Sequence, residues 1–420
     1  MDYNACPSPF LTLPIGYGMV KLGLVREGKM PWDNRVAFAP SQCKWILRHF
    51  PEVTLQVQPS PHRCFSDQEY LDAGIPLQED LSSCDILFGI KEVPIADLIP
   101  SKTYFIFSHT KKGQPYNRAM MKAFIDRKIT LVDYECLVYE DGQRILGFGF
   151  FAGVVGAHNG LKAYGIRNGS FELPPVHRFR DFRDLVQVYF EIKLPPLRIV
   201  VTGFGRVASG CIEVMNLLGI KQVEPEDFKK KKFGYPVYTQ LRGGDLFSRI
   251  ADGKYERDQF HEHPDLYECR FGEFLYSTDI LINGIYWERG MPRLFTLEDL
   301  KDPRFGIQTI ADITCDEGGS VPCNLGSSTI LDPVYGVDRF TLERKGPYQT
   351  SRTVDIMTVD NLPNELPLDA SRYFGEQLIK EVLPEILKPK SRILEQATMV
   401  FKGRLTTDFE YLRDYAYTSS

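Results

Sequence analysis

Three side chains suited to acid–base or anion chemistry end apolar segments in the first third of the 420-residue chain. Arg26 ends the segment 19–26, Lys91 follows 85–90, and His109 follows 104–107. These segments predict strands that alternate with helices, a pattern typical of a parallel sheet. Ligands of such sheets bind outside the carboxyl ends of the strands. We therefore expect a guanidinium, an amine and an imidazole to face one ligand site.

These residue types favour proton transfer next to an anionic substrate. A lysine can exchange protons when burial or nearby cations lower its pKa, and a histidine can do so because its pKa is already near neutral pH. The planar fork of arginine suits a carboxylate. Glu135 ends the next predicted strand, 129–134. Each residue also has a purely structural explanation: Arg26 could pair with a carboxylate, Lys91 with Glu92 could face solvent, and His109 could lie in the core.

A second signature lies at residues 197–210, Leu-Arg-Ile-Val-Val-Thr-Gly-Phe-Gly-Arg-Val-Ala-Ser-Gly. Its β-branched run predicts a strand buried on both faces. Gly203 allows a tight turn, Gly205 lets the backbone approach a pyrophosphate, and Ala208 lets the next helix pack closely. The start of that helix offers unpaired N–H groups to phosphate. The motif predicts a dinucleotide site, with a phosphate-free turn as the alternative.

The choice between NAD and NADP depends on Glu224, which follows the glycine turn at about the spacing of a ribose ligand. A carboxylate there would repel a 2′-phosphate and favour NAD. The basic run Lys229–Lys232 could offset this effect. We therefore expect NAD, with NADP not excluded.

The length predicts two domains in an α/β fold. We expect two Rossmann-like domains with parallel sheets flanked by helices, and an active site in the interdomain cleft. The substrate domain is assigned to 1–145 plus about 345–420, and the cofactor domain to 146–344. An apolar stretch at 144–164 predicts a helix running from the first domain into the second. A polar insertion near 227–277 is expected to be a lid with its own helices or a packing arm.

Composition excludes several classes of protein. Hydrophobic residues make up 43% and charged residues 25%, as in a globular protein. A net charge of −5 argues against nucleic acid as a partner. Nine cysteines without paired spacing favour free thiols in a reducing cytoplasm and no metal site. With neither a leader pattern at the N-terminus nor an apolar segment of membrane length, we expect a soluble, cytoplasmic protein. The oligomeric state stays open.

Several motifs resemble those of one enzyme family. They are Leu24-Val25-Arg26-Glu27, Lys91-Glu92-Val93-Pro94, Phe107-Ser108-His109, Asp133-Tyr134-Glu135, Asn283-Gly284-Ile285-Tyr286, and Thr358-Val359-Asp360-Asn361-Leu362-Pro363. Together they resemble lysine-forming saccharopine dehydrogenase, within the wider group of alanine dehydrogenase and the soluble transhydrogenase subunit. The resemblance runs along nearly the whole chain except the insertion.

The resemblance implies an NAD-dependent oxidation of a secondary amine, in which saccharopine and water give lysine and 2-oxoglutarate. It implies that Lys91 and His109 are the acid–base pair, that Arg26 and Arg144 hold substrate carboxylates, and that Glu135 lies near the substrate amine. The implied cofactor-binding residues are Gly203, Gly205, Arg206, Val207, Glu224, Ile285, Tyr286 and Asp312. The implied partners are small amino-acid and 2-oxo-acid substrates.

Two alternatives stay open. The chain could be an alanine or opine-type dehydrogenase of the same group, or a nucleotide-binding regulator without turnover. The pair Lys91 and His109 argues against the regulator, since a pure binder needs no proton-transfer groups. One departure from the family is Val207, which replaces a cysteine found in some members. Its partner position is Gly284, so no disulfide can form between these positions.

Overall fold

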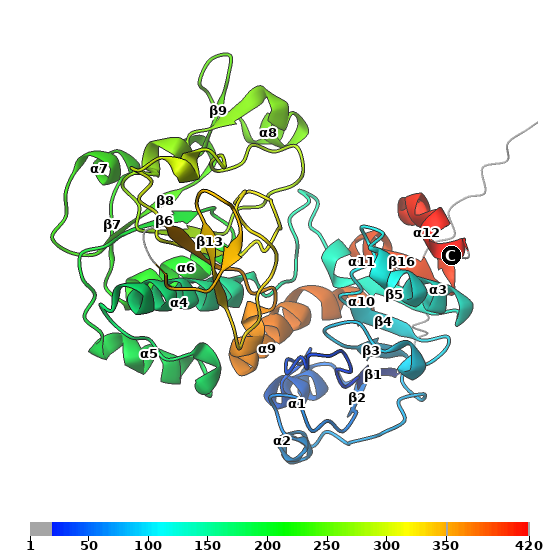
Figure 1. Cartoon of the computed structure of the whole chain (residues 1–420). Coiled ribbons are helices and arrows are strands. Elements are labelled where there is room, and N and C mark those ends of the chain that lie inside the picture. Colours follow the sequence, from blue (N-terminus) through cyan, green and yellow to red (C-terminus); the bar gives the residue numbers. More distant parts are fainter. Residues whose placement is uncertain (1–18, 350–351, 419–420) are drawn as a thin grey trace, which may run out of the picture. The chain divides into compact units, whose positions relative to one another are not determined.

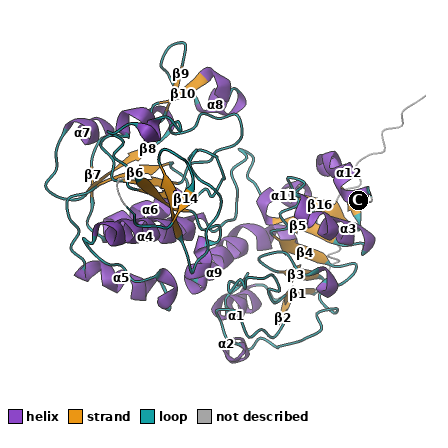
Figure 2. Ribbon diagram, viewed as in Figure 1, coloured by secondary structure: helices purple, strands orange, loops and turns teal. Residues whose placement is uncertain are grey.

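The computed structural model of the chain describes residues 19–349 and 352–418. The sequence shows no leader pattern at the N-terminus, and that prediction concerns residues that lie outside these ranges. The chain divides into two compact units: unit 1 runs to Gly147 and resumes at Pro367, and unit 2 is Phe148–Leu366. Each unit is built on a largely parallel sheet with flanking helices (Figures 1 and 2). This is the predicted α/β class.

The sheet of unit 1 has the order β17-β16-β5-β4-β3-β1-β2. Its strands are β1 (Val20–Leu24), β2 (Val53–Val57), β3 (Ile86–Phe88), β4 (Thr103–Ile106), β5 (Thr130–Asp133), β16 (Thr398–Phe401) and β17 (Arg404–Leu405). Strands β1 to β5 run parallel, and β16 is antiparallel to β5. Every residue of β3, β4 and β5 is buried, as expected for parallel strands covered on both faces.

The helices of unit 1 come from both ends of the chain. They are α1 (Pro40–His49), α2 (Asp67–Asp72), α3 (Arg118–Asp126), α9 (Pro367–Gln377), α10 (Leu383–Leu387), α11 (Arg392–Ala397) and α12 (Arg413–Tyr417). The late segment is joined to the early one by specific bonds: the Val36 N–H donates to Ser371 Oγ, and Gln42 Nε2 donates to the Arg372 carbonyl. The C-terminal residues therefore complete the first unit.

The sheet of unit 2 has the order β14-β13-β15-β12-β11-β6-β8-β7. Its strands are β6 (Arg198–Thr202), β7 (Lys221–Gln222), β8 (Val237–Leu241), β11 (Ile280–Asn283), β12 (Thr309–Asp312), β13 (Val334–Asp338), β14 (Arg344–Lys345) and β15 (Thr353–Met357). β6 lies between β11 and β8 and is parallel to both. The strand before the glycine turn is thus central in the sheet.

The helices of unit 2 are α4 (Gly149–Asn168), α5 (Phe182–Glu191), α6 (Arg206–Leu217), α7 (Pro225–Lys230) and α8 (Arg257–Glu262). In Figure 1, α4 and α6 lie side by side along the sheet, and their backbones approach closely. A Cβ on Gly153 would lie 1.9 Å from the Val207 carbonyl oxygen, and one on Gly210 would lie 1.9 Å from the Phe150 carbonyl oxygen. The two glycines therefore fix α6, and with it the helix start at the glycine turn.

Three sequence expectations need correction. The chain returns to unit 1 at Pro367, not near residue 345, because β13 and β15 pair with the second sheet. The helix expected at 144–164 begins only at Gly149 and belongs to unit 2. The segment 227–277 is not only an insertion, because β8 within it pairs with β6. The rest of that segment includes α8 and the hairpin of β9 (Phe247–Arg249) and β10 (Tyr267–Cys269).

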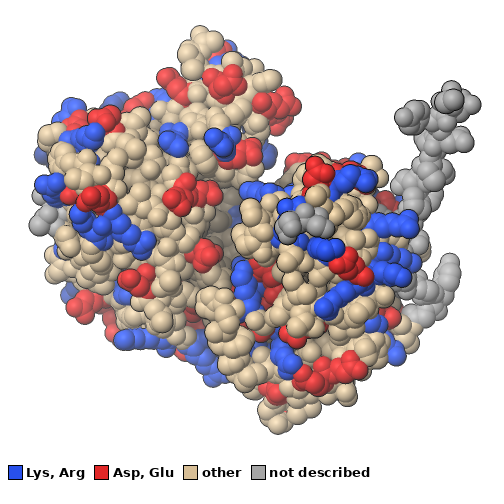
Figure 3. Space-filling view, turned by 45° about the vertical axis from the view of Figure 1, so that its right-hand side comes forward, with Lys and Arg blue, Asp and Glu red and all other residues tan. Residues whose placement is uncertain are grey.

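Charges of both signs are interspersed on the face of the molecule that Figure 3 shows. The run Lys229–Lys232 lies at and just beyond the end of α7. There Lys229 pairs with Glu226 and Glu273, and Lys231 pairs with Asp227. Among the residues that the structure describes, no helix is long and apolar enough to cross a membrane.

A buried carboxyl near the end of unit 2 predicts a pH-dependent stability. Glu365 is 3% exposed, accepts a 2.9 Å hydrogen bond from Asn159 Nδ2, and lies 3.7 Å from His177 Nδ1. Burial raises the pKa of Glu365 from 4.5 to about 7. Because the pKa of Glu365 is higher in the folded than in the unfolded state, the protonated group stabilises the fold fully at pH values below the unfolded-state pKa. This contribution is lost as the pH rises through 7.

As the pH rises from 4.5 to 7, we expect the free energy of unfolding of Glu365→Gln to increase relative to that of the wild type, by roughly 3 kcal/mol in total. Glutamine keeps an acceptor for Asn159 and removes the titration. Chemical unfolding at several pH values measures the difference, with the exposed Glu172→Gln as the control. A difference that stays constant over this range would contradict the assignment.

Candidate active site

The first candidate cluster forms where the chain leaves β1, β3 and β4 in unit 1. Glu27, just after β1, accepts the backbone N–H groups of Ile90 (2.6 Å) and Lys91 (2.9 Å) with its two carboxylate oxygens. The Phe107 N–H then donates to the Ile90 carbonyl. Burial and the nearby Asp33 raise the pKa of Glu27 to about 8. The loops that carry Lys91 and His109 are therefore held together by one carboxyl group and by strand-end bonds.

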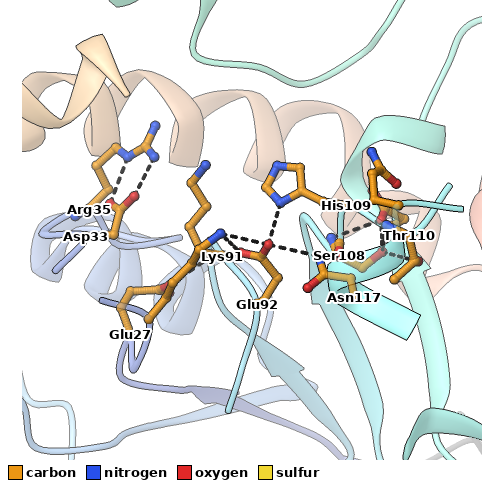
Figure 4. Close-up of polar contacts among 12 residues, drawn as sticks. Glu27, Asp33, Arg35, Lys91, Glu92, Ser108, His109, Thr110 and Asn117 are labelled. Atoms are coloured by element: carbon orange, nitrogen blue, oxygen red, sulfur yellow. Dashed lines mark hydrogen bonds and ion pairs between the residues drawn. The ribbon is translucent and has the colours of Figure 1, made fainter. Parts of the chain in front are cut away.

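Lys91 is the cation at the centre of this cluster. Figure 4 shows its side chain between the Arg35–Asp33 pair and the His109 ring. Burial and then the positive charge of Arg35 lower the pKa of Lys91. Arg35 is itself buried and donates two hydrogen bonds to Asp33, of 2.9 and 2.6 Å. The predicted lowering of a lysine pKa by burial and a neighbouring cation is thus present.

His109 is oriented by a buried carboxylate. Its Nδ1 lies 2.9 Å from Glu92 Oε1, and Lys29 Nζ lies 2.8 Å from both oxygens of Glu92. Asn117 Nδ2 donates to Glu92 Oε1 and to the Ser108 carbonyl (Figure 4). Burial alone would raise the pKa of Glu92, but hydrogen bonds from His109 and Lys29 hold it well below its usual range. An ionised Glu92 therefore accepts a hydrogen bond from the Nδ1–H group of His109, and Nε2 points away from Glu92.

A second buried carboxylate fixes the loop around His109. Asp133, at the end of β5, accepts the backbone N–H groups of Ser108 (3.0 Å) and Glu135 (2.7 Å), and Ser108 Oγ also donates to it. His109 has a φ of 49°, a backbone conformation that is costly for a residue with a side chain. The loop is held in this strained conformation by its anchors, as at many functional sites.

The three predicted substrate-binding residues have different surroundings. Arg144 Nη2 and Glu135 Oε1 form an ion pair of 3.3 Å, with Arg144 half exposed. Arg26 is exposed and its guanidinium contacts Glu79, at 2.5 and 3.0 Å. The structural alternative for Arg26, pairing with a carboxylate, is therefore observed. The structure brings Lys91 and His109 together, pairs Glu135 with Arg144, and turns Arg26 toward Glu79.

The glycine turn in unit 2 has the geometry that its sequence predicts. Gly203 has a φ of 98°, and a Cβ there would lie 2.7 Å from the Gly284 carbonyl oxygen. A Cβ on Gly205 would meet no atom within 4 Å. Gly205 is also the N-cap of α6 and has no side chain to accept a hydrogen bond from the first turn. Arg206 and Val207 are the first residues of that helix.

These features fit a bound dinucleotide, because Gly205 leaves open space at the start of α6, where the N–H groups of a first helical turn point outward. The positions of the absent disulfide are also adjacent: a Cβ on Gly284 would lie 2.7 Å from Val207 Cγ1. The Val207 side chain therefore packs against Gly284 at the place where two cysteines could form a disulfide.

Three further predicted cofactor residues lie at the ends of β11 and β12. Ile285 is buried and Tyr286 is exposed just after β11, and Tyr286 Oη donates to Glu288. Asp312 ends β12 and is fully buried. It accepts hydrogen bonds from Asn283 Nδ2 (2.9 Å), Thr314 Oγ1 (2.7 Å) and Asn324 Nδ2 (2.7 Å). Burial raises the pKa of Asp312, although these hydrogen bonds oppose the effect.

Glu224 is not brought to the glycine turn. The expectation rested on the spacing of Glu224 after the turn, but Glu224 follows β7, and β8 lies between β7 and β6. Glu224 instead serves as the N-cap of α7. The residues at the end of the neighbouring strand are Leu241, Arg242 and Gly243.

Sequence reasoning missed the carboxylates that organise the site. Glu27 and Glu92 were noted only within motifs, and Asp133 only before Glu135. The signal that could have found them is their position: each follows or ends a strand on the same sheet edge as Lys91 and His109. Their burial and partners depend on strand order, which the sequence does not give. Within residues 19–349 and 352–418, no group of three or more His, Cys, Asp or Glu side chains could hold a metal ion.

Residues 23–155 match the family described as alanine dehydrogenase/PNT, N-terminal domain. The chain is similar to the mitochondrial alpha-aminoadipic semialdehyde synthase of Rattus norvegicus, with 32% identity over 93% of this chain and 47% of the relative. It therefore spans about half the length of the first curated relatives that it matches.

A second relative matches over nearly its full length. The saccharopine dehydrogenase [NAD(+), L-lysine-forming] of Yarrowia lipolytica is 28% identical over 87% of this chain and 92% of the relative. Among solved structures, an L-alanine dehydrogenase aligns with a TM-score of 0.63 and 16% identity, over 94% of this chain and all of that one. This likeness bears out the fold, with two Rossmann-like units.

We predict that replacing the two turn glycines with alanine has different effects on stability. Gly203→Ala should destabilise the protein by roughly 1–3 kcal/mol, because alanine is strained at positive φ and its Cβ would contact the Gly284 carbonyl oxygen. Gly205→Ala should leave stability within about 0.5 kcal/mol, since its Cβ meets no atom. Thermal unfolding of both variants measures this. Equal losses of stability would show that the turn is constrained differently.

Proposed function

We propose that this chain, which is saccharopine-dehydrogenase-like and lies within the alanine dehydrogenase/PNT superfamily, is an NAD-dependent oxidoreductase. It acts on the CH–NH bond of a secondary amine derived from an amino acid. The reaction is the reversible conversion of saccharopine, NAD+ and water into lysine, 2-oxoglutarate, NADH and a proton. The observation that carries this proposal is that Lys91 lies beside a His109 ring oriented by Glu92, at one sheet edge.

The proton-transfer roles follow from the surroundings of each group. Reaction at the amine nitrogen and hydrolysis of an imine require protons to be removed from water and delivered to nitrogen. Lys91, with its lowered pKa, exchanges a proton more readily than an exposed lysine. His109 receives or gives its proton at Nε2, while Glu92 at Nδ1 stabilises the charged ring. Glu92 is a positioning residue in this scheme.

The binding roles rest on charge. Arg144 holds a substrate carboxylate and Glu135 lies near the substrate amine, so their 3.3 Å ion pair is exchanged for contacts with the substrate. Arg26 holds the second carboxylate in place of Glu79. In unit 2, Gly203, Gly205, Arg206, Val207, Ile285 and Tyr286 hold the dinucleotide, and Asp312 orders the neighbouring strand ends. When bound, the dinucleotide accepts or returns the hydride.

Under this proposal unit 1 is the substrate half and unit 2 is the NAD-binding half. The partners are small amino acids and 2-oxo acids. A cytoplasmic location is also proposed, supported by free thiols at all eight cysteines of the described residues.

A panel assay tests the proposed reaction. NADH absorbance is followed with saccharopine plus NAD, with lysine plus 2-oxoglutarate plus NADH, and with alanine plus NAD. Turnover of the first two sets supports the proposal. Turnover of alanine alone would assign an alanine-type dehydrogenase, the second candidate, which the fold likeness to L-alanine dehydrogenase favours. NAD binding without any turnover would assign a regulator.

We predict that Lys91→Met and His109→Gln each lower kcat by about 100-fold or more, while NAD affinity changes less than about threefold. The reason is that both groups act on protons and lie in unit 1. Stopped-flow turnover and calorimetric NAD binding measure the two quantities. Lys44→Met and His49→Gln, exposed on or near α1, are the controls. Equal losses of turnover and NAD affinity would remove the acid–base assignment.

A further inference from the structure

The end of β8 lies directly beside the glycine turn. The Gly203 N–H donates to the Leu241 carbonyl at 2.9 Å, and Gln240 Nε2 donates to the Gly203 carbonyl at 2.8 Å. The next residue, Arg242, is exposed, and its guanidinium forms no ion pair within the described residues. The Asp245 carboxylate accepts the backbone N–H of Arg242, at 3.3 Å. A cation therefore follows the strand that neighbours β6.

A second cation comes from α8, farther along the insertion. The Arg257 guanidinium carbon lies 5.9 Å from the ring centroid of Phe204, the residue between the two turn glycines. At the other end of α8, the His261 ring lies 6.2 Å from the ring of Tyr286. The short helix α8 thus reaches both the glycine turn and the loop after β11.

The position of α8 is fixed by an apolar cluster. Phe260, on α8, is buried and stacks on Phe247 with 4.4 Å between ring centroids, and it also contacts Tyr255 and Tyr267. Tyr255 packs against Gly243, where a Cβ would lie 3.0 Å from its ring. The carboxylate of Glu256 accepts the backbone N–H groups of Asp258 and Gln259. Arg257 is therefore held beside the turn by packing.

We infer that Arg242 and Arg257 form a contact for phosphate groups of the dinucleotide at the glycine turn. The inference deepens the proposed function and rests on it. Planar guanidinium groups bond phosphate oxygens, and both arginines are exposed. Arg242 follows the strand whose last carbonyl accepts the Gly203 N–H, Arg257 lies against Phe204, and Gly205 leaves open space in the same turn. The ligand is either the bridging diphosphate or a 2′-phosphate on the adenosine ribose. If the 2′-phosphate is the ligand, Arg242 and Arg257 take the role in choosing between NAD and NADP that was expected for Glu224.

Binding of NAD and NADP to the full chain tests this inference. Isothermal calorimetry is performed on the wild type, Arg242→Gln, Arg257→Gln and the double variant, at low and high ionic strength. The matched control is Arg304→Gln, because Arg304 is also exposed over an aromatic ring, Tyr276 at 4.5 Å. Tyr276 precedes β11, so this arginine lies at the opposite ends of the strands. Thermal unfolding checks that each variant is folded.

We expect each variant to lose about tenfold in affinity and the salt dependence of binding to become shallower. Equal losses for NAD and NADP assign the diphosphate, and a loss confined to NADP assigns the 2′-phosphate; either result supports the contact. Wild-type affinity and salt dependence in the folded double variant would overturn it. Failure of the wild type to bind either dinucleotide would instead remove the proposed function.

Discussion

In each unit, carboxyl groups at the carboxyl ends of parallel strands fix the loops that carry the candidate residues. Glu27 accepts two backbone N–H groups of the loop after β3, and Asp133 accepts two from the loops after β4 and β5. Asp312 accepts three side-chain hydrogen bonds at the end of β12. A carboxyl group removed from water is costly unless it is hydrogen-bonded, so each of the three fixes the loops that provide its hydrogen bonds. The chemistry-bearing side chains are carried by those loops.

This arrangement explains why neighbouring residues behave differently. Lys91 and Glu92 are adjacent in sequence, but Lys91 extends toward Arg35 while Glu92 is buried against His109 and Lys29. The pKa of Lys91 is lowered and that of Glu92 is held low, so an amine that loses its proton more readily than usual stands beside a carboxylate that is ionised at neutral pH. Separation of two pKa values by different surroundings is how acid–base groups acquire distinct roles.

The sequence could predict what depends on local pattern. The β-branched run before Gly203 defined β6, the turn glycines defined its geometry, and the apolar segments before Lys91 and His109 defined β3 and β4. What it could not predict depends on strand order. β8 has the sequence Val-Tyr-Thr-Gln-Leu and lies within a polar segment. Its burial therefore becomes evident only through its pairing with β6. The misplacement of Glu224 and the late return to unit 1 both follow from strands whose neighbours are distant in sequence.

The most direct test of the central claim follows one hydrogen atom. The protein is incubated with lysine, 2-oxoglutarate and NADH that carries deuterium at the transferable C4 position, and the products are analysed by mass spectrometry. The account predicts saccharopine with a single deuterium, on the carbon that was the 2-oxo carbon of 2-oxoglutarate. Formation of no saccharopine, or of saccharopine without deuterium, would contradict a hydride transfer to the CH–NH carbon.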